Sequence, residues 1–101
     1  MATYIDRATK LVAEKTHLSD GKLVRFYTLL VLTKGEDITL SDVHDAWAVN
    51  MNFKPTTDRC FGHEHHSLVP FEELPKESQK KDVFYVEALK KAARLLKTEQ
   101  P

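Results

Sequence analysis

The sequence has one cysteine, few glycines and no long apolar run. A single cysteine excludes an internal disulfide framework and is typical of proteins kept in a reducing compartment. The longest apolar stretch, residues 23–32, is interrupted by Arg25 and Thr28, so it falls short of the roughly 20 residues that a membrane span needs. The N-terminal residues lack the charged-then-apolar order of a signal peptide. We therefore expect a cytoplasmic protein with no membrane partner.

Charge is balanced overall but unevenly distributed. Residues 36–75 carry two Lys or Arg against eight Asp or Glu, whereas residues 1–35 carry six against three. A nucleic-acid surface needs a dense basic groove. The stretch that most resembles a recognition helix would also point Asp42 and Asp45 at the phosphates. Both observations argue against nucleic acid as a partner.

Hydrophobic spacing predicts two helices in the first third of the chain. The first runs from about residue 3 to 16, and its apolar positions are Ile5, Ala8, Leu11 and Val12. Ser19 and Asp20 offer an N-cap for a second helix over residues 21–34, which Gly35 can close. This second segment is apolar nearly all round, and its Val, Phe and Tyr also suit a strand. Its length and caps favour the helix.

Two further helices flank a long segment without periodicity. Thr39 and Ser41 offer caps for a third helix over residues 40–51, with a stripe of Leu40, Val43, Trp47 and Met51. A last helix is predicted from about residue 80 to 97, with a core stripe of Val83, Val86, Leu89, Ala93 and Leu96. The intervening loop is long for a compact domain and is typical of function. The fold class is therefore all-α: a small four-helix domain with one long ordered loop before the last helix. The chain, residues 1–101, forms a single domain in which residues 1–38 are an N-terminal helical pair.

The loop contains a cluster of metal-type donors. Zinc prefers the thiolate and imidazole groups found here, and the candidate ligands are Cys60, His63, His65 and His66. Structural zinc sites, however, draw ligand pairs from two separated elements, whereas these donors form one short run. Hydrogen bonding of the histidines to backbone and water is the simpler interpretation. We expect no metal and no other cofactor.

Motifs for catalysis are weak. Cys60, His44 and Asp58 supply the residue types of a thiol nucleophile and its base, but no local signature links them. The three glycines, Gly21, Gly35 and Gly62, form no phosphate-binding loop. We therefore expect a protein that is not an enzyme.

Several motifs over residues 40–96 resemble the ryanodine-receptor repeat, the RyR domain. The matching residues are His44, Trp47 and Ala48, then the turn Leu68, Val69, Pro70, Phe71 and Leu74, and then Asp82 at the entry to the last helix. Pro70 fixes its own backbone angle and keeps Val69 extended, so the turn can anchor the end of the loop against the tryptophan helix. On this resemblance the turn residues are a structural packing motif.

The resemblance implies a bacterial or phage binding domain for a small nucleotide-like ligand. Trp47 or Phe53 would stack on a base, Asn50 would read its edge, and Lys54 and Arg59 would meet a phosphate. The simpler interpretations are a core role for Trp47 and solvated surface charge for the two cations. The alternative function is a protein-protein interaction module that uses the loop and the Leu-Val-Pro-Phe surface. The apolar second helix also suggests a homodimer.

Overall fold

The computed structural model describes residues 3–52 and 70–99. Its helices are α1 (Tyr4–Thr16), α2 (Gly21–Lys34), α3 (Leu40–Asn52) and α4 (Lys76–Glu99). Two 3-10 turns, η1 (Gly35–Asp37) and η4 (Phe71–Glu73), precede α3 and α4. The all-α, four-helix prediction is confirmed. Residues 23–32 are helical, which removes the strand alternative. Most of the predicted loop lies outside the described residues.

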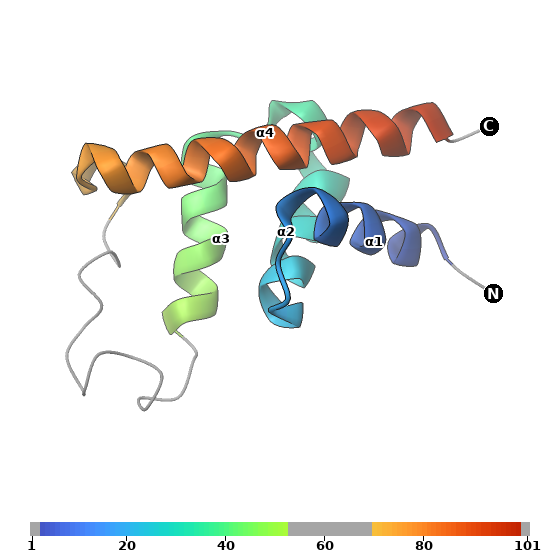
Figure 1. Cartoon of the computed structure of the whole chain (residues 1–101), viewed down its shortest axis with the longest axis horizontal. Coiled ribbons are helices and arrows are strands. Elements are labelled where there is room, and N and C mark those ends of the chain that lie inside the picture. The colour runs from blue at the N-terminus through green and yellow to red at the C-terminus, as the bar shows by residue number, and fades with distance from the viewer. Residues whose placement is uncertain (1–2, 53–69, 100–101) are drawn as a thin grey trace.

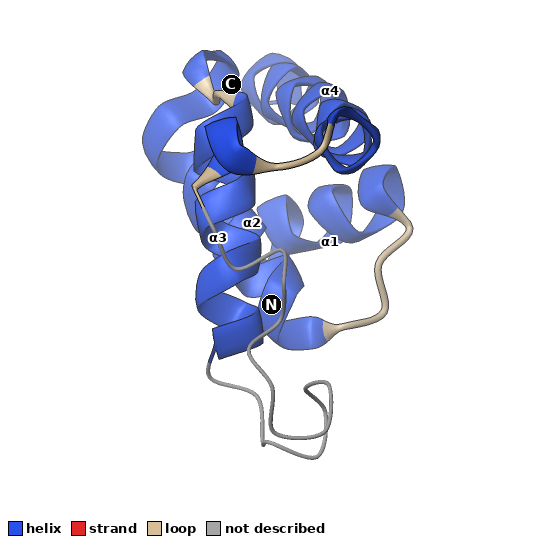
Figure 2. Cartoon of the chain, turned by 90° about the vertical axis from the view of Figure 1, so that its left-hand side faces the viewer, coloured by secondary structure: helices blue, strands red, loops and turns tan. Residues whose placement is uncertain are grey.

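The longest helix, α4, organises the others. In Figure 1, α1 lies along the C-terminal half of α4, while α2 and α3 run across its direction. Figure 2 shows α4 and α1 on one side of the domain, with α2 and α3 on the other. Helix α4 contacts each of the other three helices. Apolar side chains from all four helices therefore meet in one core.

That core contains buried side chains from every helix and from Ile38, which lies between η1 and α3: Ala8, Leu11, Val12, Leu23, Val24, Tyr27, Val31, Ile38, Val43, Val86, Leu89, Ala92, Ala93 and Leu96. Two predicted core positions are wrong, since Ile5 is 48% exposed and Val83 is 45% exposed. On α4 the residue that turns inward is the neighbour of Val83, the buried Asp82. The inward row of α4 therefore begins with a carboxylate.

Local hydrogen bonds fix where the helices begin and end. Asp20 caps α2 by accepting from the backbone N–H groups of its first turn. Thr39, not Ser41, caps α3: its Oγ1 accepts from the Asp42 N–H at 3.1 Å, and Asp42 Oδ2 accepts from the Thr39 N–H at 2.9 Å. Partial desolvation acts to raise the pKa of the Asp42 carboxyl. Hydrogen bonds from Thr39 and Lys34 outweigh it, so that pKa lies below its usual value.

The last helix starts earlier than predicted. It begins at Lys76 rather than near residue 80, and the carbonyl of Pro75 accepts from the N–H groups of Ser78 and Gln79. A proline is tolerated at a helix start because the first N–H groups have no partner inside the helix. The Gln79 side chain also donates to the carbonyls of Phe71 and Leu74. These bonds tie η4 to the first turn of α4.

Candidate functional site

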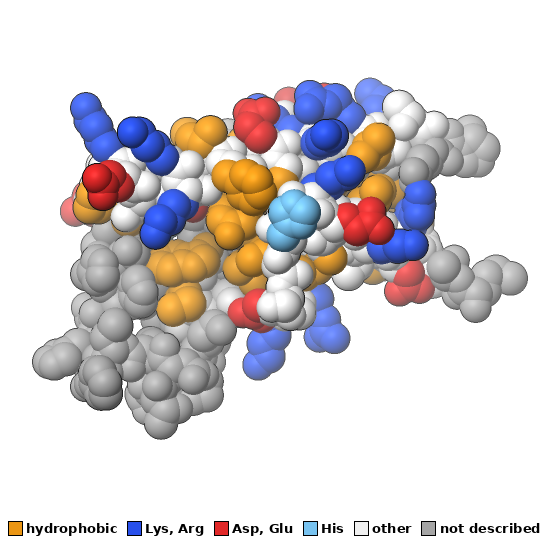
Figure 3. Space-filling model, in the orientation of Figure 1, with side chains coloured by type: hydrophobic (Ala, Val, Ile, Leu, Met, Phe, Trp, Pro, Cys, Tyr) orange, Lys and Arg blue, Asp and Glu red, His pale blue; other side chains and the backbone are white. Residues whose placement is uncertain are grey.

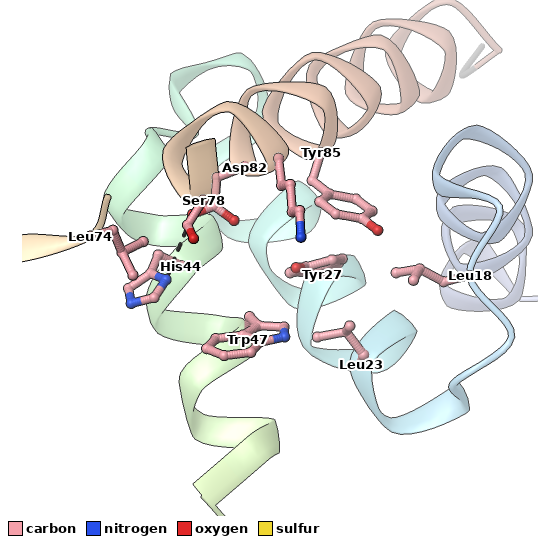
Figure 4. Close-up of a pocket in the computed structure, with 10 residues that line it drawn as sticks. Leu18, Leu23, Tyr27, His44, Trp47, Leu74, Ser78, Asp82 and Tyr85 are labelled. Carbon is pink, nitrogen blue, oxygen red and sulfur yellow. Dashed lines mark ion pairs between the residues drawn. The ribbon is translucent and has the colours of Figure 1, made fainter. Parts of the chain in front are cut away.

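A pocket of about 500 Å³ opens between α2, α3 and α4. Its apolar walls are Leu18, Leu23, Tyr27, Trp47, Leu74 and Tyr85, and its polar groups are His44, Ser78, Lys81 and Asp82. Figure 4 shows Trp47 on α3 facing Leu23 and Tyr27 on α2, with Tyr85 above them on α4. Figure 3 shows hydrophobic side chains gathered on this face between α3 and α1. The pocket thus combines aromatic walls with a few convergent polar groups, as small-ligand sites do.

Ring contacts hold the aromatic walls in place. Tyr27 and Tyr85 pack with ring centroids 5.8 Å apart. The His44 ring stacks on Trp47 at 5.6 Å and meets the edge of Phe71 at 6.3 Å. Separations of this size are those of favourable aromatic pairs. The walls are therefore fixed from both sides of the pocket.

A buried histidine and a buried aspartate face each other in the lining of the pocket. His44 Nδ1 is 3.6 Å from Asp82 Oδ2, and this oxygen is buried and accepts no hydrogen bond from the described residues. Burial raises the pKa of the Asp82 carboxyl, and the nearby His44 only partly offsets that rise. Burial also raises the pKa of the Tyr27 hydroxyl, reinforced by Asp82 and Tyr85. Tyr27 is therefore neutral at physiological pH and can donate a hydrogen bond.

The predicted ligand residues are divided between the pocket and other places. Trp47 lines the pocket. Asn50 does not line it: its buried side-chain amide donates to Asp20 Oδ2 at 3.2 Å and ties the end of α3 to the start of α2. Phe53, Lys54 and Arg59 lie outside the described residues.

The predicted packing motif does come together where it is described. Phe71 packs against His44, and Leu74 is buried beside the pocket. Asp82 faces His44 across the junction of α3 and α4. Pro70 is exposed at the start of η4, while Leu68 and Val69 lie outside the described residues. The motif therefore forms one edge of the pocket.

Sequence reasoning missed Tyr27, Tyr85 and Lys81 as pocket residues. The sequence did contain one indication for Tyr27, because a tyrosine in the middle of a buried helix needs a partner for its hydroxyl group. The sequence contained no such indication for Lys81, since it is one of several lysines in the first half of α4. Only the crossing of α2, α3 and α4 brings these side chains to one cavity.

Within residues 3–52 and 70–99 no cluster of three or more His, Cys, Asp or Glu side chains could hold a metal ion. The donors predicted from sequence, Cys60, His63, His65 and His66, lie outside that part. No helix among the described residues is both long and apolar enough to span a membrane.

Comparison with known proteins places the chain by family. A family model, a domain of unknown function named DUF7701, matches residues 3–94. The chain belongs to this family. No curated protein and no solved structure matches it.

The resemblance to the RyR domain is therefore wrong. The matched region includes α1 and α2, which the resemblance left out. The shared residues have a simpler physical origin. Trp47 and Ala48 belong to an ordinary packing helix, and the stretch from Pro70 to Leu74 is a short 3-10 turn that leads into α4. Such turns satisfy local packing in many helical folds.

Proposed function

We propose that this chain is a small non-catalytic binding domain. Its pocket takes a flat, nucleotide-like ligand with one anionic group. The observation that carries the proposal is a 500 Å³ cavity with three aromatic side chains, Tyr27, Trp47 and Tyr85, and a lysine, Lys81. A cavity of this size suits a small ligand. Aromatic walls favour a flat ring by stacking.

The charges of the pocket favour a ligand with a single anionic group. Lys81 supplies an ammonium donor at the wall, whereas Asp82, which faces His44, adds a carboxyl group to the same pocket. A polyphosphate would meet one lysine and the Asp82 carboxylate together. A monophosphate or carboxylate group can instead contact Lys81 and keep away from Asp82. Nucleoside monophosphates are therefore the first class of ligand to test.

Burial supports a binding role over catalysis. The residue best suited to proton transfer, His44, is 2% exposed. Its ring stacks on Trp47, makes an edge contact with Phe71 and faces Asp82 through Nδ1. General acid-base catalysis needs a group within hydrogen-bond reach of the substrate. His44 is instead used to position the tryptophan and the turn η4.

The chain carries its own reporter for the test, because Trp47 is its one tryptophan and lines the pocket. Adenosine monophosphate, guanosine monophosphate and adenosine would be titrated while the fluorescence of Trp47 is recorded. We expect a saturable change with the monophosphates and weaker binding of the nucleoside. Native mass spectrometry of protein purified without chelator would also reveal a ligand retained from cells.

A neighbouring lysine offers a matched control. Lys81→Ala should weaken monophosphate binding by about 10-fold, the loss of one charge-assisted contact. Lys80→Ala removes the same charge one residue away from the pocket wall and should leave the affinity unchanged. If no monophosphate alters the fluorescence and no adduct appears, the proposal fails. Equal losses from both variants would also contradict it, since they would indicate a diffuse charge effect.

A further inference from the structure

Asp82 has hydrogen-bonding capacity that the described residues leave unused. Its carboxyl belongs to the lining of the pocket, and its buried oxygen Oδ2 accepts no hydrogen bond from the described residues. The Nδ1 atom of His44 lies 3.6 Å from this oxygen, which is longer than a hydrogen bond. Buried carboxylate oxygens without a donor are rare, because nothing offsets the loss of their hydration. A donor that enters with a ligand would supply the missing bond.

The carboxyl of Asp82 is within reach of a ligand in the pocket. Its side chain is 13% exposed, and since Oδ2 is buried, this exposure belongs to the rest of the side chain. Rotation about the bond between Cβ and Cγ is soft in an aspartate, so a small turn brings both oxygens towards the pocket. An ionised carboxylate accepts hydrogen bonds at both oxygens and donates none. Asp82 therefore suits a ligand that carries two adjacent donors.

Asp82 also lies where a flat ring would present its edge. His44, which faces the carboxyl, stacks on Trp47 with the ring centroids 5.6 Å apart. Figure 4 shows the dashed contact between His44 and Asp82 on the same side of the pocket as Trp47. Burial, reinforced by the nearby Asp82 charge, raises the pKa of the Tyr27 hydroxyl and keeps it a donor. A ring stacked on Trp47 would thus meet two acceptor oxygens and one donor.

We infer that the pocket selects guanine as the base of its nucleotide and that Asp82 reads that base. The inference rests on the proposed binding of a nucleoside monophosphate. The edge of guanine carries two adjacent donors, the N1–H and the 2-amino group, which a carboxylate accepts as a pair. Next to them, the O6 of guanine is an acceptor for the Tyr27 hydroxyl. Asp82 and Tyr27 together match all three groups.

The other common bases fit this arrangement less well. Adenine and cytosine each place one amino group beside a ring nitrogen that is an acceptor, and a carboxylate repels that nitrogen. Uracil has a single N–H donor between two carbonyl oxygens, which are acceptors as well. Guanine is thus the one common base with two adjacent donors on this edge. The discrimination follows from the pattern of donors and acceptors, so it does not depend on the size of the pocket.

Three monophosphates that differ at this edge test the inference on wild-type protein. Guanosine, inosine and adenosine monophosphate would be titrated against Trp47 fluorescence at pH 8, which favours the ionised carboxylate. We expect guanosine monophosphate to bind about 10-fold or more tightly than adenosine monophosphate, as for one bidentate pair. Inosine monophosphate keeps the N1–H and lacks the 2-amino group, so its affinity should lie between the two. Isothermal titration calorimetry would check the order.

Asp82→Asn tests whether this carboxyl is the group that reads the base. The variant keeps the size of the side chain and replaces one acceptor oxygen with an amide donor. A carboxamide pairs with the amino group and N1 of adenine, so the variant should bind adenosine monophosphate at least as tightly as guanosine monophosphate. Asp45→Asn is the matched control, because Asp45 is exposed on α3 and does not line the pocket. It should keep the wild-type preference for guanine.

The possible outcomes separate this inference from the proposed function. Equal affinities of wild-type protein for guanosine and adenosine monophosphate would overturn the guanine selectivity and leave the monophosphate pocket standing. An Asp82→Asn protein that keeps its helices by circular dichroism and still prefers guanine would overturn the role of Asp82. If that variant does not fold, the order of the three affinities on wild-type protein decides. Absence of binding by all three monophosphates would refute both the inference and the proposed function.

Discussion

His44 on α3 and Asp82 on α4 face each other in the core, with Nδ1 3.6 Å from Oδ2. The pair joins the helix that carries Trp47 to the helix that carries Lys81 and Tyr85. It is therefore a structural link between two walls of the pocket. It is also an electrostatic cost, since a buried carboxylate that accepts few hydrogen bonds is stabilised less than one in water.

The pH dependence of the stability of an Asp82→Asn variant, compared with wild type, tests that cost. Burial raises the folded-state pKa of Asp82 above its unfolded value, so between these two values the folded protein holds more protons. The contribution of Asp82 to stability is therefore present at acid pH and is lost as pH rises through the folded pKa. We expect the melting temperature of the variant, relative to wild type, to increase between about pH 3.5 and pH 7.

An exposed aspartate on the same helix as His44 provides the control. Asp45→Asn changes the same charge at the surface of α3 and should show no such trend. Thermal unfolding followed by circular dichroism would measure all three proteins at each pH. If the difference in melting temperature between Asp82→Asn and wild type did not change with pH, the raised pKa of Asp82 would be contradicted. A difference that falls with pH would mean that His44 more than compensates the burial of the carboxylate.

Two neighbouring valines on α4 test which row of the helix faces the core. Val86 is buried and Val83 is exposed. Val86→Ala should lower the free energy of unfolding by about 1.5–3 kcal/mol. Val83→Ala should change it by less than about 0.5 kcal/mol. Because both variants gain the same helix propensity, their difference in urea denaturation isolates burial. Equal losses of unfolding free energy would mean that Val83 is buried as well, as the sequence predicted.

The start of α3 offers a choice between two candidate caps. Thr39 accepts from the Asp42 N–H, and Asp42 accepts in return from the Thr39 N–H. Thr39→Ala should therefore cost about 1 kcal/mol of unfolding free energy. Ser41→Ala, inside the first turn, should cost a few tenths of a kcal/mol at most. Chemical denaturation of both variants would check the assignment, and a larger loss at Ser41 would reverse it.

Substitution by alanine should change the stability of the protein in opposite directions at Gly35 and at Gly21. Gly35 ends α2 with a φ of 57°, where a side chain is strained, so Gly35→Ala should cost about 1–2 kcal/mol. Gly21 begins α2, and a Cβ added there would meet nothing within 4 Å. Gly21→Ala should stabilise the protein by about 0.5 kcal/mol. If the urea midpoints of the two variants shifted in the same direction relative to wild type, this account would be contradicted.

The helix positions were predictable because their signals are local. Asp20 and Gly35 set the two ends of α2 through their own side chain and backbone angle, so neither depends on distant contacts. The start of α4 was missed because Gln79 donates back to the carbonyls of Phe71 and Leu74, which secures an extra turn before the apolar periodicity begins. Four of the five predicted core positions of α4 are buried, and the first, Val83, is wrong: the neighbouring Asp82 is buried instead, opposite His44.

By itself, the sequence determined the number and class of the helices, their caps and the apolar character of α2. These depend on spacing and on bonds between residues a few positions apart. Only the tertiary structure decided that Tyr27, Trp47 and Lys81 line one pocket and that Leu29 stays exposed. Helical spacing places side chains around one axis. Which side chains of different helices meet depends on how those axes cross, and the packing of the whole core sets those crossings.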